Sequence, residues 1–255
     1  MSTDAPRAPL DRKRISDEIS QYWRVSVVDI TGSTQDDLMQ LVSSNQALAK
    51  SVIASEYQSA GRGRLDRSFD AASMSALTFS MYIEPKVDKA EWSFLTLLAT
   101  LSVREALASL DNSSRVAVKW PNDLMIGEKK CAGIIAQATT KGVIIGIGIN
   151  VGMNESELPV PTATSLAIEN FYELDRNIIL ATILNHFEIN LQIWELGKSF
   201  IAEYKEASST IGADVEVLLP AGVSIKSKAV GVSDAGELLL ENGEVVTVGD
   251  VIHLR

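Results

Sequence analysis

The spacing of apolar positions predicts alternating helices and strands over most of the chain. Apolar residues that recur every three or four positions indicate amphipathic helices, and apolar runs bounded by turn residues indicate strands. In chain order we expect a helix over 11–23, a strand over 25–30, a helix from 33 to about 48, strands over 51–58 and 77–83, a helix over 91–110, and strands over 115–119, 124–126, 130–138 and 142–149. Since a short turn joins the last two strands, the sheet should be mixed or antiparallel.

Two connections stand out between these elements. Ser33 is followed three residues later by Asp36, the pairing that caps a helix, which places Ser33 and Thr34 at a strand-to-helix turn. The segment 59–72 carries two glycines and three arginines but little apolar periodicity. It therefore predicts a mobile polar loop.

A change of pattern near residue 210 predicts a second, smaller domain. Residues 175–208 have helical spacing, whereas short β runs separated by turn residues follow from Gly212, which is typical of a small β-barrel. We therefore expect an α+β fold of two domains. Residues 1–209 would form a catalytic domain on a mixed β-sheet with flanking helices, and 210–255 a C-terminal barrel.

Composition indicates an ordinary globular protein. The 255 residues are 46% hydrophobic and 22% charged, which is enough apolar material for a sizeable core. No run approaches the roughly 20 apolar residues that cross a bilayer, and the charged N-terminal stretch lacks a signal peptide's apolar segment. We expect a cytoplasmic protein that binds no membrane.

Cysteine, histidine and net charge exclude several classes of site. Cys131 is the single cysteine and the chain has two histidines, so an internal disulfide is excluded and a zinc cage is hard to assemble. Any metal is expected to be magnesium held by oxygen atoms. The formal net charge of −10 argues against general affinity for nucleic-acid phosphates, and we expect no DNA binding.

The polar loop carries the first candidate chemistry. Gly61-Arg62-Gly63-Arg64, followed by Arg67, places three guanidinium groups where glycines let the backbone approach an anionic ligand closely. The alternative is that these are merely solvated surface arginines, since short motifs often occur in proteins that lack the corresponding function.

A second cluster, Lys119-Trp120-Pro121-Asn122-Asp123, directly follows a predicted strand. It combines a cation, a large aromatic, a rigid turn residue and two oxygen-bearing side chains. The alternative is an ordinary β-turn with Trp120 packed in the core.

A third segment, Lys130 to Ile135, starts an apolar strand with a lysine followed by small residues that leave room for a ligand. The lysine could hold an oxyanion, or could be an edge-strand lysine that limits aggregation. Cys131 is expected to be a small core residue. Gly146-Ile147-Gly148 lies within a strand and lacks the third glycine of a dinucleotide fingerprint, so a Rossmann fold is rejected.

Taken in order, these segments resemble the biotin protein ligase family, in its monofunctional type without an N-terminal DNA-binding domain. The resemblance covers about 28–151, and the C-terminal β module is similar to that family's small SH3-like β-barrel. It implies a class II synthetase-like fold. The matching segments are Ser33-Thr34-Gln35, Glu56-Tyr57-Gln58 with Gly61 to Arg64, Lys119 to Asp123, Lys130 to Ile134 and Gly146 to Asn150.

The resemblance also implies the roles of individual residues. Catalytic roles are implied for Lys130, Arg62 and Arg64. Contacts to biotin are implied for Ser33, Thr34, Gln35, Gln58, Arg62, Gly63, Arg64, Lys130 and Gly133. Contacts to ATP or the adenylate are implied for Arg64, Arg67, Phe69, Asn122, Asp123 and Asn150, with Asp123 also as a magnesium ligand. Two positions depart from the family pattern: Asp66 is commonly glycine and Phe69 is commonly tryptophan.

The implied reaction joins biotin and ATP to biotinyl-5'-AMP, with Mg²⁺, and then transfers biotin to a lysine of the biotin carboxyl carrier protein domain of a biotin-dependent carboxylase. Both first reactants are anionic, so cations must offset their repulsion. The 59–72 loop would cover the intermediate and exclude water. An exposed sheet edge could support a homodimer, although nothing in the sequence requires one.

Three other functions compete with this one. A lipoate or octanoate protein ligase or transferase of the same fold is the nearest, but the arginine loop followed by the 119–123 cluster favours biotin. A biotin-responsive repressor is disfavoured by the short N-terminal segment and the acidic charge. A noncatalytic interaction protein would leave the convergent arginine, lysine and asparagine positions unexplained.

Overall fold

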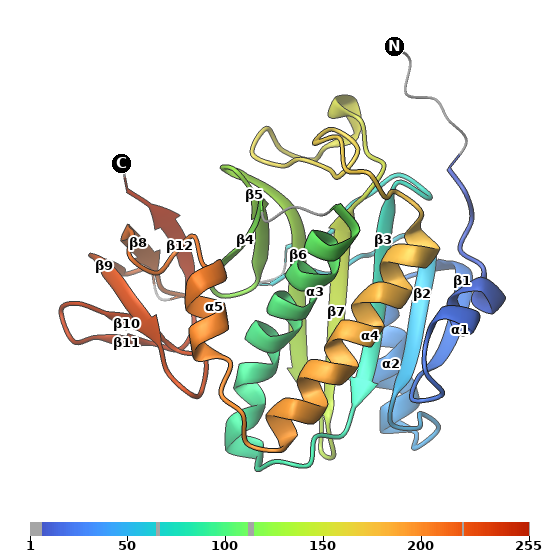
Figure 1. Cartoon of the computed structure of the whole chain (residues 1–255), viewed down its shortest axis with the longest axis horizontal. Coiled ribbons are helices and arrows are strands. Elements are labelled where there is room, and N and C mark those ends of the chain that lie inside the picture. Colours follow the sequence, from blue (N-terminus) through green and yellow to red (C-terminus); the bar gives the residue numbers. More distant parts are fainter. Residues whose placement is uncertain (1–6, 65–66, 112–114, 221, 255) are drawn as a thin grey trace.

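A seven-stranded sheet forms the centre of the computed structural model, which describes residues 7–64, 67–111, 115–220 and 222–254. The strands are β1 Arg24–Thr31, β2 Ser51–Gln58, β3 Ala76–Ile83, β4 Val116–Lys119, β5 Asp123–Ile126, β6 Lys129–Ala138 and β7 Val143–Asn150. Their order is β1-β2-β3-β7-β6-β5-β4 (Figure 1). β1 and β2 are parallel and the remaining neighbours antiparallel, so the predicted mixed sheet is confirmed.

Helices cover both faces of this sheet. They are α1 Arg12–Glu18, α2 Thr34–Ser43, α3 Leu95–Asp111, α4 Arg176–Glu195 and α5 Ile201–Ala207, with short 3-10 helices at Lys89–Phe94 and Glu155–Glu157. α3 and α4 lie side by side over one face, where the main apolar core forms (Figure 1). α2 covers the other face through Leu38, which packs with Ile53, Tyr82 and Ile144.

The helices begin and end differently from the sequence-based expectation. The first helix stops at Glu18 rather than residue 23, and α2 stops at Ser43 rather than residue 48. The expected helix over 91–110 is a 3-10 turn followed by α3. The expected helix over 175–208 is split after α4, where Gly197 adopts a φ of +92°. Apolar spacing thus located the helices, whereas turn geometry decided their ends.

The helical stretch Lys89–Asp111 is long and apolar enough to cross a membrane by length and composition. The expectation that no run approaches this length was therefore wrong. The apolar window is 61% buried inside the fold, where α3 packs against α4 and β6. Burial in the core accounts for its hydropathy.

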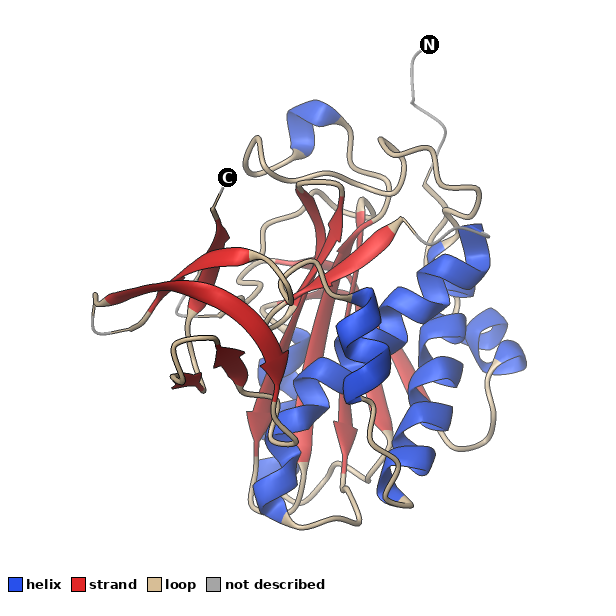
Figure 2. Cartoon of the chain, turned by 60° about the vertical axis from the view of Figure 1, so that its left-hand side comes forward, coloured by secondary structure: helices blue, strands red, loops and turns tan. Residues whose placement is uncertain are grey.

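A second, five-stranded sheet is formed by the C-terminal residues. Its strands are β8 Asp214–Leu218, β9 Ser224–Val232, β10 Leu238–Leu240, β11 Val245–Val246 and β12 Asp250–His253, in the order β11-β10-β9-β8-β12. All pairs are antiparallel, and Figure 2 shows the curved sheet beside the large one. This arrangement is consistent with the expected SH3-like module.

Trp120 joins the two sheets. Its side chain is 1% exposed, and the indole Nε1 donates a hydrogen bond of 2.9 Å to the carbonyl of Gly236, between β9 and β10. Its backbone N–H donates to Thr210 Oγ1 at 3.1 Å. The tryptophan is therefore a core residue, as the structural alternative held, and it also anchors the C-terminal sheet.

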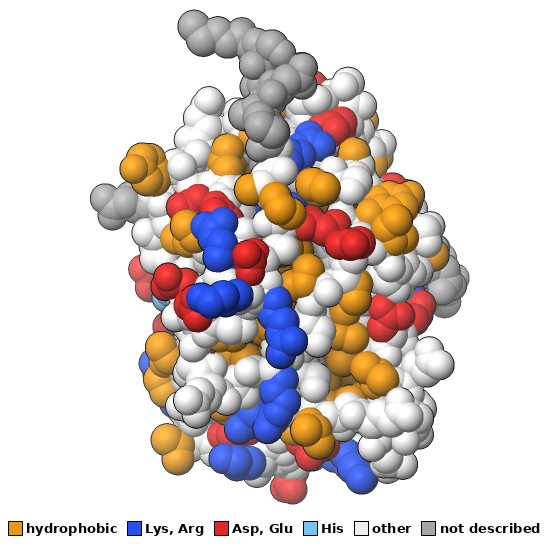
Figure 3. Space-filling view, turned by 90° about the vertical axis from the view of Figure 1, so that its right-hand side faces the viewer, with side chains coloured by type: hydrophobic (Ala, Val, Ile, Leu, Met, Phe, Trp, Pro, Cys, Tyr) orange, Lys and Arg blue, Asp and Glu red, His pale blue; other side chains and the backbone are white. Residues whose placement is uncertain are grey.

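The opposite end of the large sheet is the β1 edge. Figure 3 shows acidic, basic and apolar side chains interspersed over the face at this end of the molecule. Ile30 on β1 is 71% exposed. The described surface on this side thus carries both signs of charge.

Candidate active site

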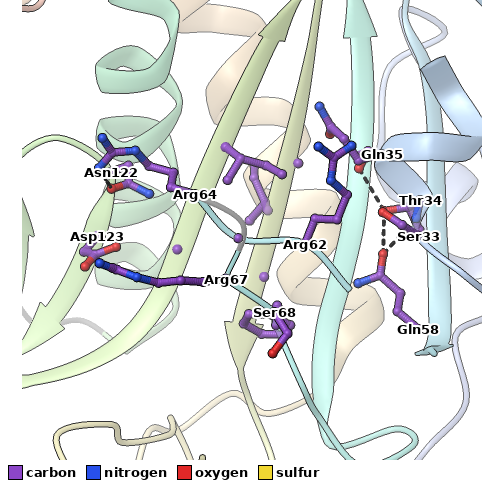
Figure 4. Close-up of a pocket in the computed structure, with 18 of the residues that line it drawn as sticks. Ser33, Thr34, Gln35, Gln58, Arg62, Arg64, Arg67, Ser68, Asn122 and Asp123 are labelled. Carbon is purple, nitrogen blue, oxygen red and sulfur yellow. Dashed lines mark hydrogen bonds between the residues drawn. The ribbon is translucent and has the colours of Figure 1, made fainter. Parts of the chain in front are cut away.

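A pocket lies on the α2 face of the large sheet, between the start of α2, the arginine loop and the turn that joins β4 to β5 (Figure 4). It brings together all the sequence-predicted site residues except Asn150. The predicted residues that line it are Ser33, Thr34, Gln35, Gln58, Arg62, Gly63, Arg64, Arg67, Phe69, Asn122, Asp123, Lys130 and Gly133. Segments up to 100 residues apart in sequence therefore converge on one cavity.

One end of the pocket is neutral, buried and hydrogen-bonded. Gln58 Oε1 accepts from the backbone N–H of Thr34 at 2.8 Å and from its hydroxyl at 3.1 Å. The Thr34 hydroxyl also lies 2.8 Å from Ser80 Oγ on β3. Ser33, Thr34 and Gln35 are each 2% exposed. This end, which Figure 4 shows beside the start of α2, is called the neutral end below.

Two groups at the neutral end remain available to a ligand. Ser33 is the N-cap of α2, but its side chain makes no capping hydrogen bond, so the expected capping pair with Asp36 was wrong. Asp36 instead accepts from Arg62 at 2.5 Å. Gln35 donates through Nε2 to the carbonyl of Ile144, whereas its Oε1 is buried without a partner among the described residues. A buried acceptor without a donor is unusual and indicates a ligand.

Glycines form the floor of the pocket. A Cβ atom at Gly146 would lie 2.7 Å from Gln35 Oε1, and one at Gly148 would lie 2.7 Å from the Phe69 ring. A Cβ at Gly133 would lie 3.1 Å from Lys130 Nζ. The two strands β6 and β7 therefore need glycine here so that these three side chains can lie against the sheet. The Gly146-Ile147-Gly148 segment is within β7, as expected.

The other end is charged, and is called the cationic end below. Lys130 Nζ forms an ion pair of 2.6 Å with Asp123 Oδ1, and their side chains are 44% and 25% exposed. Lys130 on β6 pairs with Met125 of β5 on one side and with Ala163 on the other, so the alternative of an edge-strand lysine was wrong. Asn122 donates to the carbonyl of Ile134 at 2.6 Å and accepts from Arg64 at 3.1 Å.

The arginine loop folds back on itself over this end. Gly63 N–H donates to the carbonyl of Arg67 at 2.7 Å, and Phe69 N–H donates to the carbonyl of Gly61 at 2.9 Å. These bonds hold Arg62, Arg64 and Arg67 along the pocket (Figure 4). The family departure at Asp66 lies outside the described residues, whereas the departure at Phe69 places a ring against Gly148.

Asp250 of the C-terminal sheet also lines the pocket, and sequence reasoning missed it. Its carboxylate forms ion pairs with Arg64, at 3.5 Å, and with Arg67. The neighbouring Gly249 carbonyl accepts from both terminal nitrogens of Arg64 at 3.3 Å. No local motif surrounds Asp250, so only the tertiary structure could identify it. Ser80 was missed for the same reason.

Asn150 is the one predicted residue that the pocket does not include. It ends β7 and is 6% exposed, and its amide donates to the carbonyl of Thr164 at 2.9 Å. In this structure it holds the 163–166 segment against the sheet. Cys131 is a core residue, as expected: burial raises the pKa of its thiol to about 12.

Electrostatics at the cationic end reflect burial. Desolvation lowers the pKa of Arg64, partly opposed by Asp250. Desolvation also lowers the pKa of Lys119, with Asp123 acting in the opposite direction and the nearby charge of Lys130 lowering it further. Partly desolvated cations without full compensation attract anions more strongly than solvated ones.

The described residues contain no cluster of three or more His, Cys, Asp or Glu side chains that could hold a metal ion alone. Asp123 and Asp250 are the carboxylates on the wall of the cationic end. One or two carboxylates, completed by phosphate oxygens and water, are the usual protein ligands of nucleotide-bound magnesium. This donor set fits a magnesium ion that arrives with a nucleotide and does not fit zinc.

Comparison with known proteins connects this site to a family. The sequence pattern of the biotin/lipoate A/B protein ligase family matches residues 27–154. The chain is 34% identical to the biotin–acetyl-CoA-carboxylase ligase of Mycobacterium tuberculosis, across 99% of this chain and 98% of that protein. It is 29% identical to the bifunctional ligase/repressor BirA of Salmonella typhimurium, across 100% of this chain and 81% of that protein.

A solved structure has the same fold. The biotin protein ligase from Aquifex aeolicus in complex with biotin and ATP superposes with a TM-score of 0.77 at 27% identity, covering 91% of this chain and 99% of that one. The expected class of fold is thereby confirmed.

Proposed function

The chain belongs to the biotin/lipoate A/B protein ligase family, and from this membership we infer that it activates biotin with ATP to biotinyl-5'-AMP and transfers the biotin to a lysine of a carrier domain. The family includes ligases for biotin and for lipoate, so membership alone does not identify which of these two carboxylic acids is the substrate. The neutral end of the pocket supports biotin.

The unpartnered Gln35 Oε1 is the observation that carries this assignment. The bicyclic head of biotin contains a cyclic urea with two N–H donors and one carbonyl acceptor. Gln35 can accept from one N–H, and the hydroxyls of Ser33 and Thr34 can complete the remaining bonds. The dithiolane ring of lipoate has no N–H group and would leave Gln35 Oε1 unpaired, which disfavours lipoate.

The cationic end suits the first half-reaction. A carboxylate oxygen of biotin attacks the α-phosphorus of ATP, the bond to the β-phosphate oxygen breaks, and pyrophosphate leaves. Both reactants are anions, so Lys130, Arg62 and Arg64 would offset their repulsion and hold them in line. Lys130 Nζ lies over Gly133, where no side chain intervenes, and from there it would reach the reacting atoms.

The second half-reaction needs the intermediate to survive. The neutral amine of the carrier lysine attacks the acyl carbon, the bond between that carbon and the phosphate oxygen breaks, AMP leaves, and the nitrogen releases a proton as the amide forms. The folded-back arginine loop would exclude water from the mixed anhydride until the amine arrives.

We propose Asp123 as the protein ligand of Mg²⁺ at this site. When bound, the ion would neutralise charge on the nucleotide phosphates. Asp123 pairs with Lys130 in the present structure, and the carboxylate can hold both cations because each of its two oxygens accepts more than one contact.

The carrier is proposed to be the biotin carboxyl carrier protein domain of a carboxylase. We further propose that the enzyme is cytoplasmic. On the basis of the net charge of −10 we also propose that it binds no DNA. A homodimer is compatible with a free sheet edge.

A competition experiment tests the proposal. The protein would be incubated with ATP, Mg²⁺, an apo carrier domain and equal amounts of biotin and lipoate, and the mass of the carrier measured. A biotin adduct that requires ATP is expected. A lipoyl adduct would transfer the assignment to the lipoate branch, and formation of neither adduct nor pyrophosphate would refute the ligase activity.

A further inference from the structure

The C-terminal sheet contributes charge to a site that the large sheet otherwise builds. Asp250, the first residue of β12, contacts Arg64 and Arg67 of the arginine loop. The loop lies 183 residues earlier in the chain, counted from Arg67. These ion pairs connect the C-terminal sheet to the arginine loop.

The contact fixes Arg64 in particular. The Arg64 side chain is 20% exposed, so its guanidinium has lost much of its water and needs protein acceptors. The Gly249 carbonyl, Asn122 Oδ1 and Asp250 provide them. These acceptors take both Nη1 hydrogens and one Nη2 hydrogen. Nε has no acceptor among the described residues, so the guanidinium is held while donors remain for an oxyanion.

The contact with Arg67 is more exposed. The Arg67 side chain is 64% exposed, and exposed ion pairs add little to stability. Only Nη2 of Arg67 has a partner among the described residues. Asp250 therefore orients Arg67 toward the pocket without occupying all its donors.

We propose that Asp250 is a positioning residue of the ligase: it holds Arg64 and Arg67 over the cationic end so that the biotinyl-5'-AMP intermediate is retained until the carrier arrives. This inference rests on the proposed function. It gives the C-terminal sheet a part in retaining the intermediate, and that part is exerted through the two arginines.

The test compares Asp250→Asn, Asp250→Glu and a matched control, Glu216→Gln. Glu216 lies on the adjacent strand β8, pairs with Lys226 at 3.6 Å and does not line the pocket. Without carrier, we would measure labelled biotinyl-5'-AMP released per pyrophosphate formed, together with kcat and KM for ATP. We expect Asp250→Asn to raise the release of biotinyl-5'-AMP and the KM for ATP about tenfold. Asp250→Glu keeps the carboxylate and should return both values most of the way to those of the unmodified protein. Glu216→Gln should match the unmodified protein.

Two results would overturn the inference. The first is that Asp250→Asn leaves both the release of biotinyl-5'-AMP and the KM for ATP unchanged. The other comes from Arg67→Ala and the double variant: if Asp250 acts through the arginines, the two effects are less than additive, whereas additive effects would assign Asp250 a different role. The double variant also separates positioning from any loss of stability. If the unmodified protein forms no biotinyl-5'-AMP, the proposed function fails instead, so the two failures are distinguishable.

Discussion

The two ends of the pocket differ in how they are held. At the neutral end, Ser33, Thr34 and Gln35 are each 2% exposed and are organised by hydrogen bonds between uncharged groups. At the cationic end, Lys130 and Arg67 are 44% and 64% exposed and are paired with carboxylates. Buried groups held by hydrogen bonds at the neutral end favour selectivity. The cationic end holds its charges in pairs that anionic substrates can rearrange.

The largest effect is expected from Lys130→Ala, which removes a cation from the reacting groups. We expect adenylate formation, measured as pyrophosphate release, to fall about 100-fold or more. Lys129→Ala, on the same strand and exposed, is the matched control and should keep normal activity. Near-normal pyrophosphate release by Lys130→Ala would defeat the catalytic assignment.

A substitution at the neutral end should affect binding instead. In Gly146→Ala the new Cβ would lie 2.7 Å from Gln35 Oε1 and would displace this acceptor from the urea. We expect KM for biotin to rise about 10-fold to 100-fold, with a smaller change in KM for ATP. Gly231→Ala in β9, where the Cβ has space, is the control. An equal rise in both KM values would show that the two ends are not independent.

Arg64→Ala should make the cationic end release its product early. The variant loses the guanidinium that lies between Asn122 and the C-terminal sheet. We expect labelled biotinyl-5'-AMP to dissociate about tenfold faster. Filtration or rapid gel separation would measure this dissociation. Arg24→Ala on the exposed β1 edge is the control. Unchanged retention in Arg64→Ala would count against the loop's role.

The smallest effect concerns pH and the C-terminal sheet. Burial, assisted by the charge of Lys119, lowers the pKa of His253 below its ordinary value of 6.5. Above pH 6.5 the imidazole is neutral in both states and contributes nothing. As the pH falls below 6.5 the unfolded chain takes up the proton first, so stability declines. We expect Tm to fall less between pH 7 and 5 in His253→Gln than in the unmodified protein, and parallel Tm curves would contradict this.

Sequence reasoning succeeded where information was local. Strand β2 has the predicted bounds, and one pocket is lined by motif residues at the start of α2, by the arginine loop and by Asn122 and Asp123. It was less successful at helix ends. The Ser33–Asp36 spacing is a local signal for a cap, but Asp36 found a stronger partner in Arg62.

Tertiary contacts also changed the roles within recognised motifs. Glu56 belongs to a matching segment, yet it forms a buried ion pair of 2.6 Å with Arg176 at the start of α4. Asn150 closes β7 onto Thr164 and does not line the pocket. A motif identifies residues that occur together, but each side chain's direction depends on the strand register and on what packs above it.

The mixed sheet, the C-terminal β module and the segments that line the pocket could be predicted from the chain alone, because apolar periodicity and short motifs are properties of neighbouring residues. Only the tertiary structure decided that Gly146 and Gly148 form the floor, that Gln35 keeps a free acceptor, and that Asp250 reaches the arginine loop. Those facts depend on atoms brought together by packing across 79 residues of chain (Phe69 to Gly148) up to 183 (Arg67 to Asp250), and no pattern within a local window records such distances.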